Sequence, residues 1–141
     1  MKQREKCFKR IIIISLMLVV MVSSVAIAKA SSSSRYLFVF EMRAYGGKDQ
    51  SDAQIKDNSD NYAFVTFDSI SAYYIDYPPY YRIRSGTNDK AASALQTFSM
   101  EHDDEVPYNS GFGQRGLPYY LRMQTDSNSS LNMTAEGYWA P

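Results

Sequence analysis

The chain has 141 residues, of which 45% are hydrophobic and 14% aromatic, and its fifteen basic residues equal its fifteen acidic residues in number. This length suits one small domain and leaves no room for a second. The only cysteine, Cys7, lies near the N-terminus, so a disulfide framework is excluded.

The first thirty residues have the layout of a secretory signal. Five basic residues precede an unbroken apolar run over residues 11–27, and two overlapping A-x-A sites follow it. We expect a signal peptide at 1–30, cleaved after Ala28 or Ala30, and therefore a secreted, extracellular protein that meets a membrane only through its signal peptide. An uncleaved membrane anchor is the alternative. Residues 31–34 then form a flexible Ser-rich spacer, and residues 35–141 a single domain.

Removal of the signal makes the remaining chain acidic. The signal contains six basic residues and one acidic residue, so nine basic and fourteen acidic residues remain, for a net charge of about −5. Phosphate backbones are bound by clustered lysine and arginine side chains. We therefore expect no nucleic acid partner, and the net charge does not favour an anionic bilayer or wall surface.

Period-two patterns after the spacer predict short strands. Residues 36–43 indicate a strand that is apolar on both faces at its start and polar on one face at its end, and residues 81–84 alternate between apolar and polar side chains. Further strands are expected at 62–67, 72–77, 95–100, 119–124 and 131–137. The polar segments 48–61 and 101–116 are predicted to be long exposed loops, and residues 126–130 a hairpin turn. The pattern indicates an all-β fold. We predict a small antiparallel β-sandwich of about six to seven strands, with a small barrel as the alternative.

Five tyrosines surround the Pro78-Pro79 step, which interrupts any strand because neither proline donates a backbone hydrogen bond. Exposed tyrosine rings stack on sugar faces, and their hydroxyls bond polar ligands. Tyr77, Tyr80 and Tyr81 are therefore a candidate ligand-binding platform. Alternatively, the cluster only strengthens the sheet through cross-strand pairs.

No motif in the sequence predicts catalysis or a metal site. His102, the only histidine, lies among four carboxylates, but consecutive residues cannot all face one ion, so a solvated acidic loop is the simpler interpretation. The segment that begins at Asp126 lacks the glycine and the glutamate of a calcium loop. No serine lies in a G-x-S-x-G elbow. We expect a protein that is not an enzyme and has no cofactor.

The end of the chain supplies a resemblance. Tyr119 and its neighbours, followed by a polar turn and the segment LNMTAEGYWAP with its Gly137-Tyr138-Trp139 ending, resemble the C-terminal end of a group of small secreted proteins of unknown function from Gram-positive bacteria. That group is similar to the lactococcin-like bacteriocins. The resemblance implies a small β-sandwich that acts at the cell envelope, and it implies no functional residue. From the residues alone, Trp139 is expected to bury its ring in the core with its N–H paired, a ligand contact being the alternative.

Three functions are compatible with these observations. The leading hypothesis is a secreted, non-enzymatic, bacteriocin-like protein that acts at the bacterial cell surface, with an envelope or wall component as its partner. The second is a carbohydrate- or cell-wall-binding module that uses the tyrosine platform. The third is a structural or assembly protein of a biofilm or coat, because segments such as YLFVF can pair edge to edge.

Overall fold

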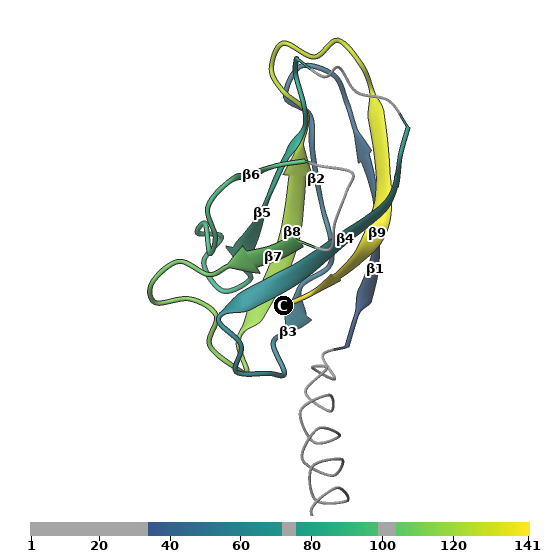
Figure 1. Ribbon diagram of the computed structural model, residues 1–141. Coiled ribbons are helices and arrows are strands. Elements are labelled where there is room, and N and C mark those ends of the chain that lie inside the picture. Colours follow the sequence, from purple (N-terminus) through teal and green to yellow (C-terminus); the bar gives the residue numbers. More distant parts are fainter. Residues whose placement is uncertain (1–33, 72–75, 99–103) are drawn as a thin grey trace, which may run out of the picture. The chain divides into compact units, whose positions relative to one another are not determined.

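The computed structural model describes residues 34–71, 76–98 and 104–141 (Figure 1). These ranges contain nine strands and no helix, so none of the described residues forms a helix that could cross a bilayer. Residues 33–141 form a compact unit whose apolar core comes entirely from this unit. The expected signal peptide, nearly all of the expected spacer, most of the strand expected at 72–77 and His102 lie outside the described residues.

The first sheet has the strand order β1-β9-β4-β7, and every neighbouring pair is antiparallel. β1 pairs with β9 along its whole length, from Tyr36 opposite Trp139 to Met42 opposite Met133. The ladder between β4 and β9 is irregular between Phe67 and Ser69. The strands of this sheet are β1 (Tyr36–Met42), β4 (Tyr62–Ile70), β7 (Asp104–Pro107) and β9 (Met133–Ala140).

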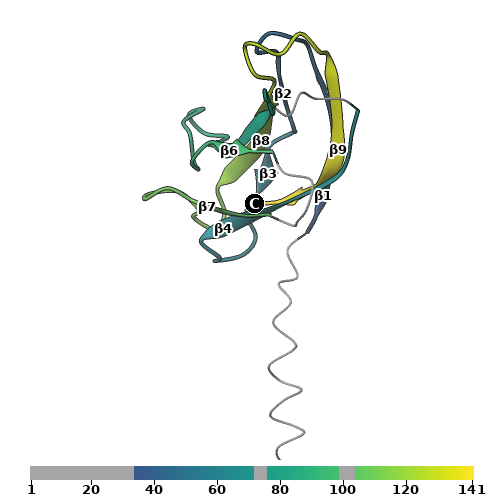
Figure 2. The ribbon, with the colours of Figure 1, turned by 45° about the horizontal axis from the view of Figure 1, so that its top comes forward.

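The second sheet has the order β2-β8-β5-β6, and β3 also pairs with β8. Its strands are again antiparallel. Figures 1 and 2 show β8 and β6 in one layer and β1 and β9 in the other. The strands of this sheet are β2 (Lys48–Gln50), β3 (Gln54–Ile55), β5 (Tyr80–Ser85), β6 (Gln96–Thr97) and β8 (Pro118–Gln124). The two packed antiparallel sheets confirm the predicted all-β sandwich.

Short strands occupy parts of both segments that were predicted to be exposed loops. β2 and β3 lie in 48–61, and β7 lies in 101–116. In addition, the side chain of Lys56 is fully buried. The loop prediction is wrong there because these segments join the sheets through backbone hydrogen bonds, which the polarity of their side chains does not reveal.

The segment after β8 is not the predicted hairpin turn. β8 and β9 belong to different sheets, and the chain between them crosses from one layer to the other (Figure 1). This crossing is held by the turn that follows β1: the Thr125 hydroxyl donates to the Arg43 carbonyl at 2.8 Å, and the Tyr45 amide donates to the Ser129 carbonyl at 2.7 Å. Since these contacts are distant in sequence, local turn chemistry did not predict them.

Inward-facing side chains of both sheets fill the core. The partly buried ring of Phe67 packs against this core and makes edge-on contacts with Phe38, Tyr81 and Phe98 at centroid distances of 4.8–5.5 Å. These contacts join β1 and β4 of one sheet to β5 and to Phe98, the residue after β6, in the other. Aromatic pairs of this geometry stabilise a fold by roughly 0.5–1.5 kcal/mol each beyond the apolar area that they bury.

The closing Gly137-Tyr138-Trp139 segment is part of β9. Trp139 is 1% exposed, so its ring belongs to the core as expected, but its indole N–H has no acceptor among the described residues, although the sequence predicted that it would be paired. A Cβ at Gly137 would lie 2.0 Å from the Thr66 carbonyl oxygen. Glycine is therefore required at this position, where β4 approaches β9 closely.

Candidate functional site

The three tyrosines of the predicted platform do not share a face. Tyr81 is 1% exposed, and its hydroxyl donates to the Asp104 carboxylate. Burial raises the pKa of this hydroxyl, so it stays protonated. Tyr80 lies on the outer face of β5, because alternation along a strand sends neighbouring side chains to opposite faces, and Tyr77 is exposed before β5 begins. A surface ligand cannot stack on Tyr81, so the platform does not exist as predicted.

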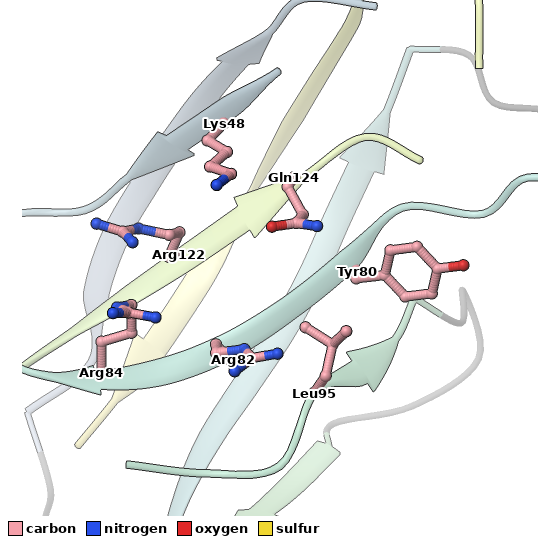
Figure 3. Close-up of a pocket in the computed structure, with 7 residues that line it drawn as sticks. All are labelled: Lys48, Tyr80, Arg82, Arg84, Leu95, Arg122 and Gln124. Carbon is pink, nitrogen blue, oxygen red and sulfur yellow. The ribbon is translucent and has the colours of Figure 1, made fainter. Parts of the chain in front are cut away.

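Four cationic side chains gather instead on the outer face of the second sheet. Arg82 and Arg84 come from β5, Arg122 from β8 and Lys48 from β2. They border a hollow of about 200 Å³. Figure 3 shows these side chains with the other residues that line the hollow. We call the complete set the basic face: Lys48, Tyr80, Arg82, Arg84, Leu95, Arg122 and Gln124.

The strand register brings these residues together. Arg82 lies directly opposite Arg122, and Gln124 lies opposite both Tyr80 and Lys48. Residues that are opposite in an antiparallel ladder present their side chains to the same face. The intervening residues of β5, such as Ile83, point into the core. The same alternation that builds the sandwich therefore places the cations together on its outer surface.

Two of the arginines are held in place by other side chains. The Asp89 carboxylate accepts from Arg84 Nε at 2.8 Å and lies 3.4 Å from Arg122 Nη2. Arg122 also donates to Gln50 Oε1 at 2.7 Å, and both guanidinium groups donate to the Tyr120 hydroxyl at 3.1–3.2 Å. The hydrogen bond from Arg84 lowers the pKa of Asp89, so this carboxylate remains charged. The two guanidinium groups are thus already oriented before any ligand arrives.

Arg82 and Lys48 differ from the two held arginines. Within the part of the chain that the structure describes, neither side chain makes a hydrogen bond or an ion pair. Arg82 is in register with Arg122, and directly opposed like charges destabilise a sheet. A bound anion would relieve this repulsion. Departures of this kind from local consistency concentrate at functional sites.

Tyr80 and Leu95 form the less charged end of the basic face (Figure 3). The Tyr80 hydroxyl donates to Asp126 Oδ2 at 2.9 Å, and this hydrogen bond raises the pKa of Tyr80. The pKa of Asp126 is lowered mainly by the backbone amide of Asn128 and then by Tyr80. The half-buried ring of Tyr80 is fixed at its hydroxyl end and offers an aromatic surface beside the arginines.

The charge of the basic face is opposite in sign to that of the chain after residue 30. The face contains four cations and no carboxylate, and the carboxylates of Asp89 and Asp126 bond to its members from outside the set, whereas the whole segment has a net charge of about −5. Local potential, not net charge, decides which ligands a face attracts. The net-charge argument against anionic partners therefore does not apply to this face.

Other described parts of the chain offer weaker candidates. A second hollow of about 440 Å³ lies where β1 and β9 meet Ser71, and Glu41 and Arg43 give its lining mixed charge. Among the described residues, no three His, Cys, Asp or Glu side chains are placed to hold a metal ion. The basic face is therefore the candidate functional site.

No family model matches the chain, and no match is found among curated proteins or solved structures. What the fold and the site define is a class: a small antiparallel β-sandwich with a cationic and aromatic outer sheet face. The alternation of Tyr80, Arg82 and Arg84 was visible in the sequence and marks one side of the site. The pairing with Arg122 and Lys48, which completes it, carried no local signal.

Proposed function

We propose that this protein is a non-enzymatic, secreted binding protein that recognises an anionic glycan of the cell envelope through the basic face. The observation that carries the proposal is the opposed pair of Arg82 and Arg122, with the half-buried Tyr80 two residues from Arg82 on the same face of β5. The proposal joins the two leading functions expected from the sequence, which are contact at the cell surface and binding of a carbohydrate or wall polymer.

The arginines supply the charge recognition. A guanidinium group presents donors in a planar fork that matches carboxylate and phosphate oxygens in a bidentate arrangement. Arg122 and Arg84 are held by Asp89 and Tyr120, so little side-chain entropy is lost when they bind. Arg82 has no competing partner among the described residues and can turn to the ligand.

The size of the hollow favours one unit of a polymer over a complete small molecule. Its volume of about 200 Å³ is below the roughly 300–1,000 Å³ of pockets that enclose drug-sized ligands. It can take one charged group or one sugar ring, while the rest of the polymer lies over the sheet. Tyr80 stands where such a sugar ring would stack. Binding by each unit is then weak, and repetition along the polymer strengthens it.

Titration calorimetry on the segment 31–141, which contains the whole compact unit, tests the proposal. The ligands are a polyuronate, a poly(glycerol phosphate), a neutral glucan and a single-stranded DNA oligonucleotide. We expect binding to the anionic glycopolymers that weakens as salt is added, and none to the neutral glucan. The anionic polymer that binds with the higher affinity shows whether the site prefers carboxylate or phosphate groups. Stronger binding to DNA, or equal binding to the neutral glucan, would refute the proposal.

Two matched pairs of variants assign the binding to this face. Arg82→Gln should lower the affinity about fivefold to tenfold at low salt, whereas Arg115→Gln, which removes an exposed arginine outside the face, should leave it unchanged. Tyr80→Leu should weaken binding of the glycan but not of inorganic polyphosphate, and Tyr80→Phe should retain glycan binding because it keeps the ring. If Arg82→Gln and Arg115→Gln changed the affinity equally, the ligand would not bind at the basic face.

A further inference from the structure

β1 forms the outer edge of the first sheet (Figure 2). Among the described strands, it forms a ladder only with β9. Leu37 and Val39 are 63% and 55% exposed in the middle of this strand. It contains no proline, and its register with β9 is unbroken. Over Leu37 and Val39 it therefore lacks the proline, bulge or charged side chain that keeps an edge strand from pairing with another chain.

The open backbone groups of this edge belong to Leu37 and Val39. The Glu41 amide donates to Asp49 Oδ2 at 2.8 Å, and its register partner Thr134 instead exchanges hydrogen bonds with Ser71, through its own amide and carbonyl, at 2.9 Å each. Glu41 and Thr134 are thus a pair that is not mutually hydrogen-bonded. Since bonded and non-bonded pairs alternate along an antiparallel ladder, the amides and carbonyls of Leu37 and Val39 also point away from β9.

Asp49 protects only one end of the edge. Its carboxylate occupies the Glu41 amide, and no comparable cap is present at Leu37 or Val39 among the described residues. Backbone groups and apolar side chains are thus open together over the same two residues. This combination favours addition of a strand, in which main-chain hydrogen bonds supply affinity and alternate side chains supply specificity.

We propose that the strand added here is β1 of a second copy, antiparallel and centred on Phe38. In this register Leu37 of each copy lies opposite Val39 of the other, and Arg35 lies opposite Glu41. The two open residues of each copy then exchange four main-chain hydrogen bonds across a two-fold axis. Both the apolar pairs and the charged pairs are self-complementary, as an isologous interface requires.

The charges distinguish this register from its neighbours. A pairing centred on Val39 would place Arg35 opposite Arg43, and a pairing centred on Leu37 would place Arg35 opposite Val39. Like charges directly opposite destabilise a sheet, and opposite charges stabilise it. Among the registers that align the open backbone groups, the one centred on Phe38 therefore combines matched charges with matched apolar side chains.

The dimer does not rest on the proposed function, because β1 and the basic face belong to different sheets. Sedimentation velocity on the segment 31–141, from micromolar to millimolar concentration, tests it at physiological salt. We expect a dimer that forms reversibly as the concentration rises, since an interface of one strand pair is small. A monomer at every concentration would overturn the proposal.

Variants test the edge and the register separately. Val39→Lys should raise the dissociation constant of the dimer at least about tenfold, while Leu117→Lys, at another exposed apolar residue, should not change it. Leu37→Pro should also disrupt the dimer but leave the β1–β9 ladder intact, because the amide that it removes points outward. Circular dichroism verifies that each variant is folded. A dimer that persists in both Val39→Lys and Leu37→Pro would contradict the edge pairing.

A charge swap examines the register. Arg35→Glu should weaken the dimer, because it places two carboxylates opposite each other. The double variant with Arg35→Glu and Glu41→Arg should restore the dimer, a recovery that general damage to the fold would not give. Failure of the double variant to recover would refute pairing centred on Phe38.

Discussion

Arg82→Gln should stabilise the fold while it weakens the binding of anions. Arg82 lies opposite Arg122 in the ladder and two residues from Arg84 on the same face. Its own guanidinium has no acidic partner among the described residues, whereas Asp89 partly neutralises the other two. Glutamine keeps a polar side chain of moderate length, so the principal change is the loss of one positive charge.

The magnitude follows from the register. Directly opposed like charges on a sheet cost roughly 0.2–1 kcal/mol. Two unit charges at a separation of roughly 7 Å repel by about 0.6 kcal/mol in water without salt. Arg82 has one cation opposite it, Arg122, and one two residues away on its own strand, Arg84. After allowance for the charge of Asp89, we expect the free energy of unfolding to rise by roughly 0.5–1 kcal/mol at low salt. The gain should nearly disappear at about 1 M salt, where the Debye length is about 3 Å.

Urea unfolding at low and high NaCl measures this gain. For a domain of this size, a change of that magnitude moves the urea midpoint up by about 0.5 M. Arg115→Gln, the matched control, should show no comparable difference between the two salt concentrations. A lower midpoint for Arg82→Gln at low salt, or a gain that does not depend on salt, would refute the repulsion on which the site argument depends.

Three further substitutions test other parts of the structure. Asp89→Asn removes the internal anion that competes with a ligand for Arg84 and Arg122, and asparagine is compatible with the left-handed backbone at this position, where φ is 54°. Calorimetry should show an affinity for the anionic polymer about threefold higher. A lower affinity would indicate that Asp89 mainly orients the arginines. Gly137→Ala should lower the free energy of unfolding by about 3 kcal/mol, because its Cβ would meet the Thr66 carbonyl; an unchanged urea midpoint would show that the ladder yields there. Burial lowers the pKa of Lys56 below its ordinary 10.5, although the negative charges of Asp60 and Asp57 act in the opposite direction. Between the lowered pKa and 10.5, the unfolded chain therefore binds more protons at this residue than the folded chain does. Wild-type stability should therefore rise relative to Lys56→Met as pH increases toward 10.5, and a difference independent of pH would contradict this interpretation.

Local alternation allowed parts of the fold to be predicted from the sequence. In β1, Phe38 and Phe40 face the core while Leu37 and Val39 face solvent, two sets that the period of two had already assigned to opposite faces. The same rule anticipated the two faces of β5 at Ile83. These features depend only on the geometry of one extended strand, which any sequence with this pattern adopts once a core is available.

Alternation along one strand could not predict which distant strands pair with each other. Alternation put Tyr81 on the inward face with Ile83, but it did not show that Arg122 of β8 lies opposite Arg82 on the outer face. The polar segment before β4 looked like a loop and nevertheless supplies β2, and the chain after β8 crosses to the other sheet. Each difference arises from backbone hydrogen bonds or contacts to residues remote in sequence.

The order of residues along the chain thus determined an aromatic, strand-rich polypeptide whose core is formed without disulfides, and it determined which side chains share a face within each strand. Only the tertiary structure decided that Arg82 stands opposite Arg122, forty residues later, and that the edge of β1 remains open. The physical reason is that alternation is a property of one strand, whereas the register and order of strands depend on the packing of the whole core.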